Sequence, residues 1–308
     1  MSYAAEVKNE LTRLPVHYEH AKAELAAFIR LNGILKKIDG EWLLNIETEN
    51  ATIARRMYTL IKRHYEVQSE IIVRKKMKLK KNNVYIIRLR SGSQPILADL
   101  KILDGLLYHG GIPKEFKEDD QKARSYLRGA FLARGSVNSP ETGRYHLEIY
   151  SPYEEHNNDL LEMINHFHLN AKSLQRKNGG YIVYIKEAEK IADFLRVIGA
   201  VNSLFKFEDI RIVRDMRNSV NRLVNCENAN INKAVNAAQE QIEDITLVDE
   251  MVGLHTLPTH LKEIAYLRLE NPEASLKQLG ELYPDKKISK SAVNHRLRKL
   301  RELADTYR

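Results

Sequence analysis

Six polar residues near the C-terminus are spaced to share one side of a helix. They fall in the predicted helix Ser289–Ala304 and are Lys290, Ser291, Asn294, His295, Arg298 and Arg301. Asparagine can pair with adenine, and arginine or lysine with guanine, at base edges in the major groove of a duplex. Ser289 is placed to cap this helix, and Lys286 and Lys287 in the preceding turn could hold phosphates.

An apolar face would hold this helix against its neighbours. Its members recur at helical spacing and are Leu276, Leu279, Leu282, Ile288, Val293, Leu297, Leu300 and Ala304. The predicted order is a helix over Leu257–Glu270, a shorter helix over Ser275–Tyr283, a turn over Pro284–Lys287 and then the final helix. This order is typical of a helix-turn-helix, whose last helix enters the major groove. A helical bundle with a solvated basic face and a protein-binding module are the alternatives.

A second set of residues lies in a stretch that occurs twice. Ala21–Gly33 reads AKAELAAFIRLNG, and Ala123–Gly135 reads ARSYLRGAFLARG. Each is a predicted helix with two adjacent small residues inside it and a glycine at its end. Because small residues let another helix approach closely, we expect the two helices to pack together. Asn32 and Arg134 then lie near their ends.

Similar elements follow each of the two stretches. In the first half we predict strands and helices over Trp42–Glu47, Ala51–Tyr65, Val67–Val73, Val84–Leu89 and Ile96–Leu107. In the second half they fall over Tyr145–Tyr150, Tyr153–His168, Ala171–Arg176, Tyr181–Lys186 and Glu187–Ile198. If a weak strand is allowed, in the second half within Arg134–Asn138, each half has the order αββαββα. The predicted fold class is α+β, a pseudo-twofold duplicated unit followed by an all-α helix-turn-helix domain.

Composition favours an anionic partner. The chain has 308 residues, a formal net charge of +8 and a sequence pI near 9.3. Nucleic acid is the commonest soluble anion for such a protein. The start, MSYAAEVKNELTRL, lacks the apolar core of a signal peptide, and no apolar run is long enough to cross a membrane. The single cysteine, Cys226, excludes an internal disulfide and fits a reducing cytoplasm.

The doubled stretch resembles the nine-residue signature of LAGLIDADG homing endonucleases, in Leu25–Gly33 and again in Leu127–Gly135. The resemblance implies two α/β halves joined along the motif helices, with paired sheets over duplex DNA. That family has a metal-binding acid at the next-to-last motif position, where this chain has Asn32 and Arg134. Divalent cations need anionic oxygen ligands, so we expect no nuclease activity, no metal and no cofactor. Glu148 is an acid that could substitute, although no pattern places it there.

Two further segments carry weaker signals. The first is a basic run that could be a second phosphate-binding element or a solvated hairpin tip. Its cations are Arg74, Lys75, Lys76, Lys78, Lys80 and Lys81. The second is polar and rich in arginine and asparagine over Lys206–Asn232, and Val248–Thr256 after it is a predicted linker. Within it, Asn218–Asn232 could form a network of helix caps or contact phosphates.

The whole chain resembles the WhiA family of bacterial regulators. The resemblance rests on the start MSYAAEVKNEL, the degenerate doubled motif, the residues from Asn221 to Asn230 and the final helix-turn-helix. It implies a DNA-binding transcriptional regulator tied to cell division and chromosome segregation, and to sporulation in spore formers. The domains expected are an N-terminal helix (1–20), the duplicated unit (21–202, with halves 21–110 and 122–200), a helical linker (203–256) and the DNA-binding domain (257–308).

The predicted partner is double-stranded DNA, at the nucleoid in the cytoplasm, with a protein partner in transcription left open. The sequence does not fix the oligomeric state or the operator. The rival hypotheses are an active metal-dependent endonuclease and a scaffold whose helix-turn-helix binds protein.

Overall fold

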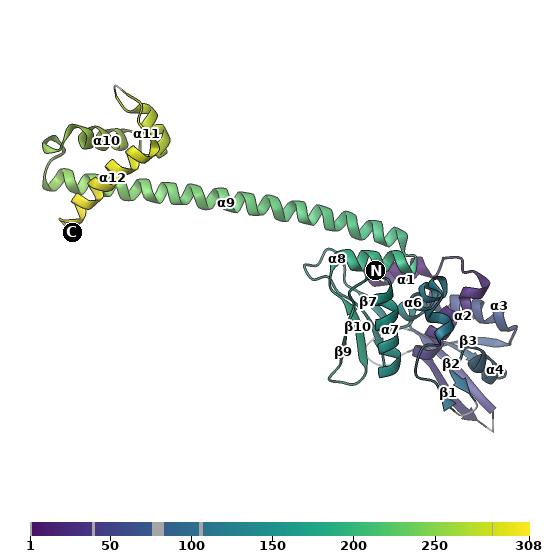
Figure 1. Cartoon of the computed structure of the whole chain (residues 1–308). Coiled ribbons are helices and arrows are strands. Elements are labelled where there is room, and N and C mark those ends of the chain that lie inside the picture. Colours follow the sequence, from purple (N-terminus) through teal and green to yellow (C-terminus); the bar gives the residue numbers. More distant parts are fainter. Residues whose placement is uncertain (1, 39–40, 76–82, 105–106, 285) are drawn as a thin grey trace. The chain divides into compact units, whose positions relative to one another are not determined.

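The computed structural model describes residues 2–38, 41–75, 83–104, 107–284 and 286–308. The chain divides into two compact units, Met1–Arg214 and Asp215–Arg308. The long helix α9 (Val201–Met251) begins in the first unit and ends in the second. Each unit is described by itself below, with the element labels of Figure 1.

The first half of unit 1 builds one antiparallel sheet. Its elements are α2 (Tyr18–Asn32), β1 (Gly33–Ile38), β2 (Glu41–Thr48), α3 (Ala51–Tyr65), β3 (Ser69–Lys75), β4 (Asn83–Leu89) and α4 (Ser93–Asp99). The strand order is β1-β2-β4-β3. Alternation along the strands gives the sheet a buried face, with Leu44 and Ile46 on β2 and Ile87 and Leu89 on β4 all in the core.

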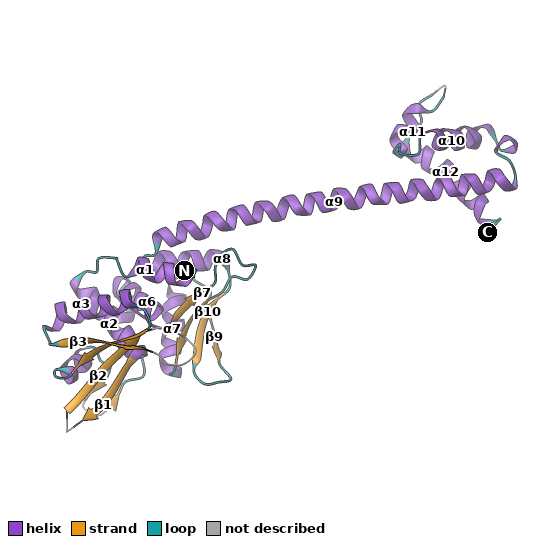
Figure 2. Ribbon diagram, turned by 180° about the vertical axis from the view of Figure 1, so that it is seen from behind, coloured by secondary structure: helices purple, strands orange, loops and turns teal. Residues whose placement is uncertain are grey.

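The second half repeats this arrangement. Its elements are α6 (Asp120–Arg134), β7 (Gly135–Val137), β8 (Leu147–Ser151), α7 (Glu154–His166), β9 (Lys172–Gln175), β10 (Tyr181–Ile185) and α8 (Ala188–Ile198). The order β7-β8-β10-β9 matches that of the first sheet. The predicted duplication is therefore confirmed, and the weak strand expected within Arg134–Asn138 is β7. Figure 2 shows the two sheets in orange, one for each half.

The remaining elements of unit 1 connect or cover these halves. They are α1 (Tyr3–Leu11), β5 (Leu103–Asp104), β6 (Leu107–Tyr108) and α5 (Lys114–Lys117). The start of α1 is capped by Ser2, whose hydroxyl accepts a hydrogen bond from the amide of Ala5. Val7 and Leu11 on this helix are fully buried in the core of the unit.

The prediction of one helix over Ile96–Leu107 was wrong beyond Asp99. Lys101 adopts a left-handed backbone (φ 54°), and the amide of Ile102 bonds back to the carbonyl of Leu97. This is a Schellman-type helix end, which glycine usually forms. A lysine in the left-handed position gives no such signal in the sequence, so the stop before β5 was missed.

The polar segment is helical, as the expected helical linker implies, but two details differ. Lys206–Asn232 lies inside the continuous helix α9, which runs on to Met251, so the linker expected to start at Val248 starts later. The asparagines of Asn218–Asn232 are exposed on this helix. Because interior helical amides bond to carbonyls four residues back, these side chains form no network of helix caps. Gly253 (φ 81°) follows the end of α9.

Unit 2 is a small helical domain. After η1 (Leu254–Thr256) come α10 (Thr259–Glu270), α11 (Leu276–Leu282) and α12 (Lys290–Asp305). Its core gathers side chains from all of them and from the end of α9, including Ile245, Val248, Ile264, Leu279, Val293, Leu297 and Leu300. The prediction that Leu282 joins this face was wrong. Its side chain is 53% exposed because α11 ends there, and Tyr283 packs against the core instead.

Among the described residues, no helix combines the length and apolarity that a membrane span requires.

Candidate nucleic-acid interface

The two motif helices pack directly against each other, as predicted. A Cβ atom on Gly129 of α6 would lie 2.3 Å from the carbonyl oxygen of Glu24 on α2. Only glycine permits such an approach of one helix backbone to another. Ala26, Ala27 and Ala130 are fully buried along the same contact. We call the line of contact between α2 and α6 the seam.

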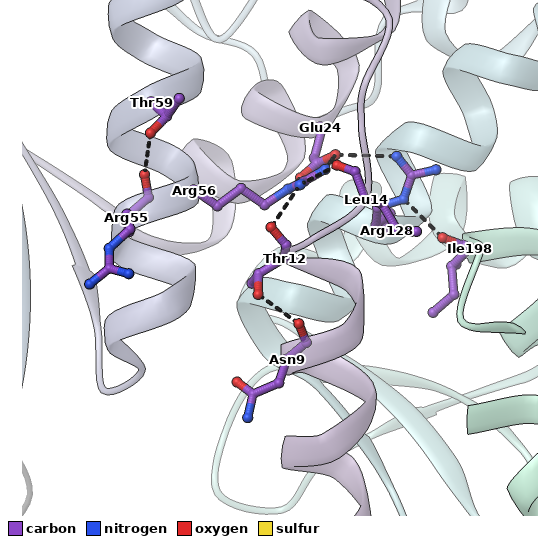
Figure 3. Close-up of polar contacts among 9 residues, drawn as sticks. All are labelled: Asn9, Thr12, Leu14, Glu24, Arg55, Arg56, Thr59, Arg128 and Ile198. Carbon is purple, nitrogen blue, oxygen red and sulfur yellow. Dashed lines mark hydrogen bonds and ion pairs between the residues drawn. The ribbon is translucent and has the colours of Figure 1, made fainter. Parts of the chain in front are cut away.

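A buried ion cluster ties the seam to its surroundings (Figure 3). The fully buried carboxylate of Glu24 accepts hydrogen bonds from Arg56 at 2.5 and 3.0 Å, and from Arg128 at 3.4 Å. Both guanidinium groups also donate to backbone carbonyls, those of Thr12, Leu14 and Ile198. A buried carboxylate is stable only when its charge is paired and its lone pairs are satisfied, so this cluster fixes the two halves in register.

The ends of the motif helices meet a third residue that the sequence did not indicate. Asn32 is only 8% exposed, and Arg134 donates to the carbonyl of Leu31 across the seam at 3.3 and 3.4 Å. Lys8 of α1 reaches the same place. Burial, and then the nearby charge of Arg134, lower the pKa of Lys8 to about 8. The position of Lys8 depends on how α1 packs, which no local pattern reveals.

These residues do not fit a divalent metal. At the two positions where a LAGLIDADG nuclease has its acids, this chain has the amide of Asn32 and the cation of Arg134, and Lys8 adds a second cation beside them. In the ranges that the structure describes, no group of three or more His, Cys, Asp or Glu could hold a metal ion. Nearby cations repel a divalent ion, so the seam has the opposite electrostatic character from a metal site.

Glu148, the suggested substitute acid, lies on the outer face of the second sheet. Its carboxylate contacts His146 at 3.0 Å and Arg176 at 2.5 Å. Burial raises its pKa, but the hydrogen bonds from these two partners outweigh that effect and lower it. The same face carries Arg176 over the ring of Tyr150 at 5.6 Å. Glu148 is therefore committed to local ion pairs.

In unit 2, the turn between α11 and α12 is tight. A Cβ on Gly280 would lie 2.3 Å from the carbonyl oxygen of Ile288. Ser275 opens α11 with a capping box to Gln278. The buried Arg268 on α10 donates to the carbonyls of the next loop, the shortest bond being 2.7 Å to Ala274. These contacts fix the angle at which α12 leaves its neighbours.

The last helix presents the predicted polar face. Ser289 caps α12, its hydroxyl accepting from the amide of Ala292, as expected. All of the proposed contact residues in and before this helix are exposed: Lys286, Lys287, Ser289, Lys290, Ser291, Asn294, His295, Arg298 and Arg301. Lys299 is also exposed on α12, and it was not among the predicted contact residues.

Two of these arginines already have partners within unit 2. Arg298 pairs with Glu302 one turn later at 3.2 Å, with both side chains well exposed. Arg301 pairs with Glu240 of α9 at 3.2 Å. Exposed ion pairs are weak, so a phosphate or a base edge can compete for either side chain. Among the described residues of unit 2, the predicted contact residues of α12 that form no ion pair are Lys290, Ser291, Asn294 and His295, and all four lie in its first half.

The basic run of the first half is described only in part. Arg74 and Lys75 at the end of β3 are exposed, and Arg74 pairs with Glu47 at 3.3 Å. The other cations of this run, Lys76, Lys78, Lys80 and Lys81, lie outside the described residues.

Comparison with known proteins identifies the family. Three family models match successive parts of the chain: the WhiA N-terminal LAGLIDADG-like domain over residues 18–103, the WhiA LAGLIDADG-like domain over 123–217 and the WhiA C-terminal HTH domain over 220–304. A relative from Enterococcus faecalis, named probable cell division protein WhiA, is 63% identical over 100% of this chain and 99% of its own. The chain belongs to the WhiA family.

Other WhiA proteins agree with this assignment. The relative of the same name from Latilactobacillus sakei is 61% identical over 99% of this chain and 98% of its own. The crystal structure of full-length DUF199/WhiA from Thermatoga maritima has a TM-score of 0.60 at 28% identity, covering 99% of this chain and 98% of that one. The structure of the N-terminal LAGLIDADG domain of DUF199/WhiA has a TM-score of 0.51 at 27% identity, over 64% and 89%. The predicted fold class is confirmed.

Proposed function

We propose that this chain is a sequence-specific DNA-binding transcriptional regulator without nuclease activity. The main support is the exposed polar face of α12, which is capped by Ser289, preceded by two lysines and held on a buried apolar face. A helix that is anchored on one side and polar on the other can enter a major groove with its first turns. In this proposal Asn294 and Arg298 read bases, and Lys286 and Lys287 hold phosphates.

The proposal extends to the cellular role. Relatives that match the full chain are named probable cell division proteins, which supports a role in cell division here. A role in chromosome segregation, and in sporulation where the organism forms spores, is what the family resemblance implies. The protein would then act at the nucleoid in the cytoplasm, with a protein partner in transcription.

The domain limits proposed are 1–20, 21–202, 203–256 and 257–308. In this proposal the basic run that begins at Arg74 forms a second DNA contact.

The absence of nuclease activity is proposed from the seam. Lys8 and Arg134 disfavour metal ions there. Phosphodiester cleavage in the nuclease family depends on such metal ions. The test is incubation of supercoiled plasmid with the full chain and magnesium or manganese. We expect the plasmid to stay supercoiled. Nicking by the parent protein that disappears when EDTA is added would instead support the endonuclease hypothesis.

The DNA-binding proposal is tested by selecting genomic fragments with the full chain and sequencing the bound pool. We expect a shared sequence motif for the parent protein and its loss for an Asn294→Ala/Arg298→Ala double variant. Mapping by crosslinking in cells should then give discrete peaks at promoters. A pool without a shared motif would favour the scaffold hypothesis, in which unit 2 binds protein.

A further inference from the structure

A cavity of about 430 Å³ opens at the end of the seam, entirely within unit 1. It is formed where α1, the ends of α2 and α6, the loop after β2 and the strands β3 and β4 meet. Its polar lining comprises Lys8, Asn32, Glu47, Thr48, Glu49, Asn50, Arg74 and Arg134. Pockets that hold small ligands typically have volumes of about 300–1,000 Å³.

Positive charge dominates the lining at one end. Arg74 pairs with Glu47, whereas the ion pairs found among the described residues include none to Lys8 or Arg134. Within the described part of the chain, Lys8 lies over the face of the Phe131 ring, at 5.7 Å from its centroid, and Arg134 donates to the backbone carbonyl of Leu31. Lys8 is partly buried and Arg134 is exposed. Two neighbouring like charges, one of them partly buried, raise the free energy of the folded chain unless an anion compensates them.

Asn32 adds an independent sign that the cavity takes a ligand. Asn32 is more than nine-tenths buried and lines the cavity, and its Oδ1 atom has no hydrogen-bond partner in the ranges that the structure describes. Buried polar atoms are nearly always paired, and an unpaired one needs an explanation. A ligand that offers a hydroxyl group beside an anion would satisfy this oxygen.

We propose that this cavity binds the phosphate group of a small phosphorylated metabolite that carries a neighbouring hydroxyl. Lys8 and Arg134 bind the phosphate oxygens, and Asn32 Oδ1 accepts a hydrogen bond from the hydroxyl. A phosphate monoester carries about −1.5 to −2 charges at neutral pH, which matches two uncompensated cations better than a carboxylate does. A cation pair at the end of the motif helices thus takes a phosphate group without a metal.

The same phosphate chemistry is present in the DNA backbone, but the amide distinguishes the two sources. A phosphodiester has no O–H group, so it leaves Asn32 Oδ1 unpaired, and leaving a buried acceptor unpaired is unfavourable. A small phosphorylated molecule with a hydroxyl therefore fits better. The two sources are compared directly in the experiment.

The experiment uses the full chain without DNA and glycerol 3-phosphate as the probe. Binding is followed by broadening of the phosphorus-31 signal, and stability by fluorescence of the only tryptophan, Trp42, which lies in unit 1. At ten times its Kd the probe raises the ratio of folded to unfolded protein about tenfold. Sodium sulfate and sodium chloride at equal ionic strength, and a short duplex DNA, are the comparison ligands.

Three variants locate the site. Lys8→Met and Arg134→Met should each abolish the broadening and the thermal shift, while Lys62→Met, an exposed lysine on α3, should change neither. Without ligand, Lys8→Met should melt at a higher temperature than the parent protein, because it removes one of two like charges. A higher melting temperature of Lys8→Met would show that this variant is folded, so that its loss of binding is not due to unfolding.

The proposal is overturned if the probe and sulfate shift the melting temperature equally, or if both methionine variants bind as the parent does. Stabilisation of unit 1 by duplex DNA alone, lost in Lys8→Met, would assign the cavity to the DNA backbone and reject the metabolite. Sequence recognition by α12 is measured separately, so its failure and the failure of this site can be told apart.

Discussion

At the scale of single residues, the observed contact of Arg298 can be separated from its proposed contact with DNA. It forms an exposed ion pair with Glu302, and we propose that it pairs with guanine. We expect Arg298→Ala to weaken binding to the selected DNA by about 1–3 kcal/mol and to relax the preference at one base position. Quantitative mobility-shift assays on operator variants measure this.

Glu302→Ala is the matched control for that prediction. It removes the same ion pair but keeps the arginine, so DNA binding should be unchanged or slightly stronger. Both substitutions should leave stability within about 1 kcal/mol of the parent, because an exposed ion pair contributes little. If the two variants lose equal affinity, the ion pair and not base contact explains the effect.

His156 shows how burial sets a pH dependence. It lies between the hydroxyl of Tyr126 at 2.9 Å and that of Ser151 at 3.0 Å, and Arg30 donates to the same Tyr126 hydroxyl. Burial first, and then the charge of Arg30, lower the pKa of His156 from 6.5 to about 3. This neutral imidazole links α2, α6 and α7 across the two halves.

The folded chain therefore binds fewer protons at His156 than the unfolded chain between pH 6.5 and about 3. The contribution of neutral His156 to stability is complete above the pKa of the unfolded chain and is lost as the pH falls. Over that range the free energy of unfolding decreases by at most about 1.4 kcal/mol per pH unit on account of this residue. In urea unfolding followed by Trp42 fluorescence, the free energy of unfolding should fall less steeply with decreasing pH in His156→Gln than in the parent. Identical slopes would contradict the assignment.

At the scale of elements, the seam depends on one glycine. A methyl group at position 129 would collide with the backbone of α2, which cannot move as a flexible side chain can. We expect Gly129→Ala to lower the free energy of unfolding of unit 1 by about 1–3 kcal/mol or more, despite the better helix propensity of alanine. Denaturant unfolding followed by Trp42 fluorescence gives this value.

Gly143→Ala provides the comparison for Gly129→Ala. Gly143 has no atom within 4 Å of an added Cβ and its φ is not positive, so the substitution should be neutral or slightly stabilising. Equal destabilisation by both substitutions would mean that close packing at the seam is not the reason.

At the scale of the whole molecule, the net charge of +8 predicts a strong salt dependence of DNA binding. Each neutralised phosphate releases counterions, so log K should fall linearly with log salt. A Lys286→Ala/Lys287→Ala double variant should reduce the magnitude of this slope by about 2 without changing the sequence preference. Affinities measured from low to high salt on cognate and random duplexes test this, and an unchanged slope would exclude these lysines as phosphate contacts.

The sequence by itself determined the repeat, the helix-turn-helix and most of the elements. Its apolar periodicities act within a few residues, so Ala51–Tyr65 and the capped start of α12 at Ser289 follow from local pattern alone. The small residues of the motif helices also indicated the seam, because close helix contact requires them. The loss of both motif acids, at Asn32 and Arg134, could be read directly.

Only the tertiary structure decided what gathers around the seam. Lys8 lies far from Arg134 in the sequence, and the buried cluster of Glu24, Arg56 and Arg128 joins three separate helices. Such contacts are set by how elements pack, and residue types along one helix do not encode them. The exposure of Leu282 has the same origin, since its helical spacing is correct but its helix ends before the core closes over it.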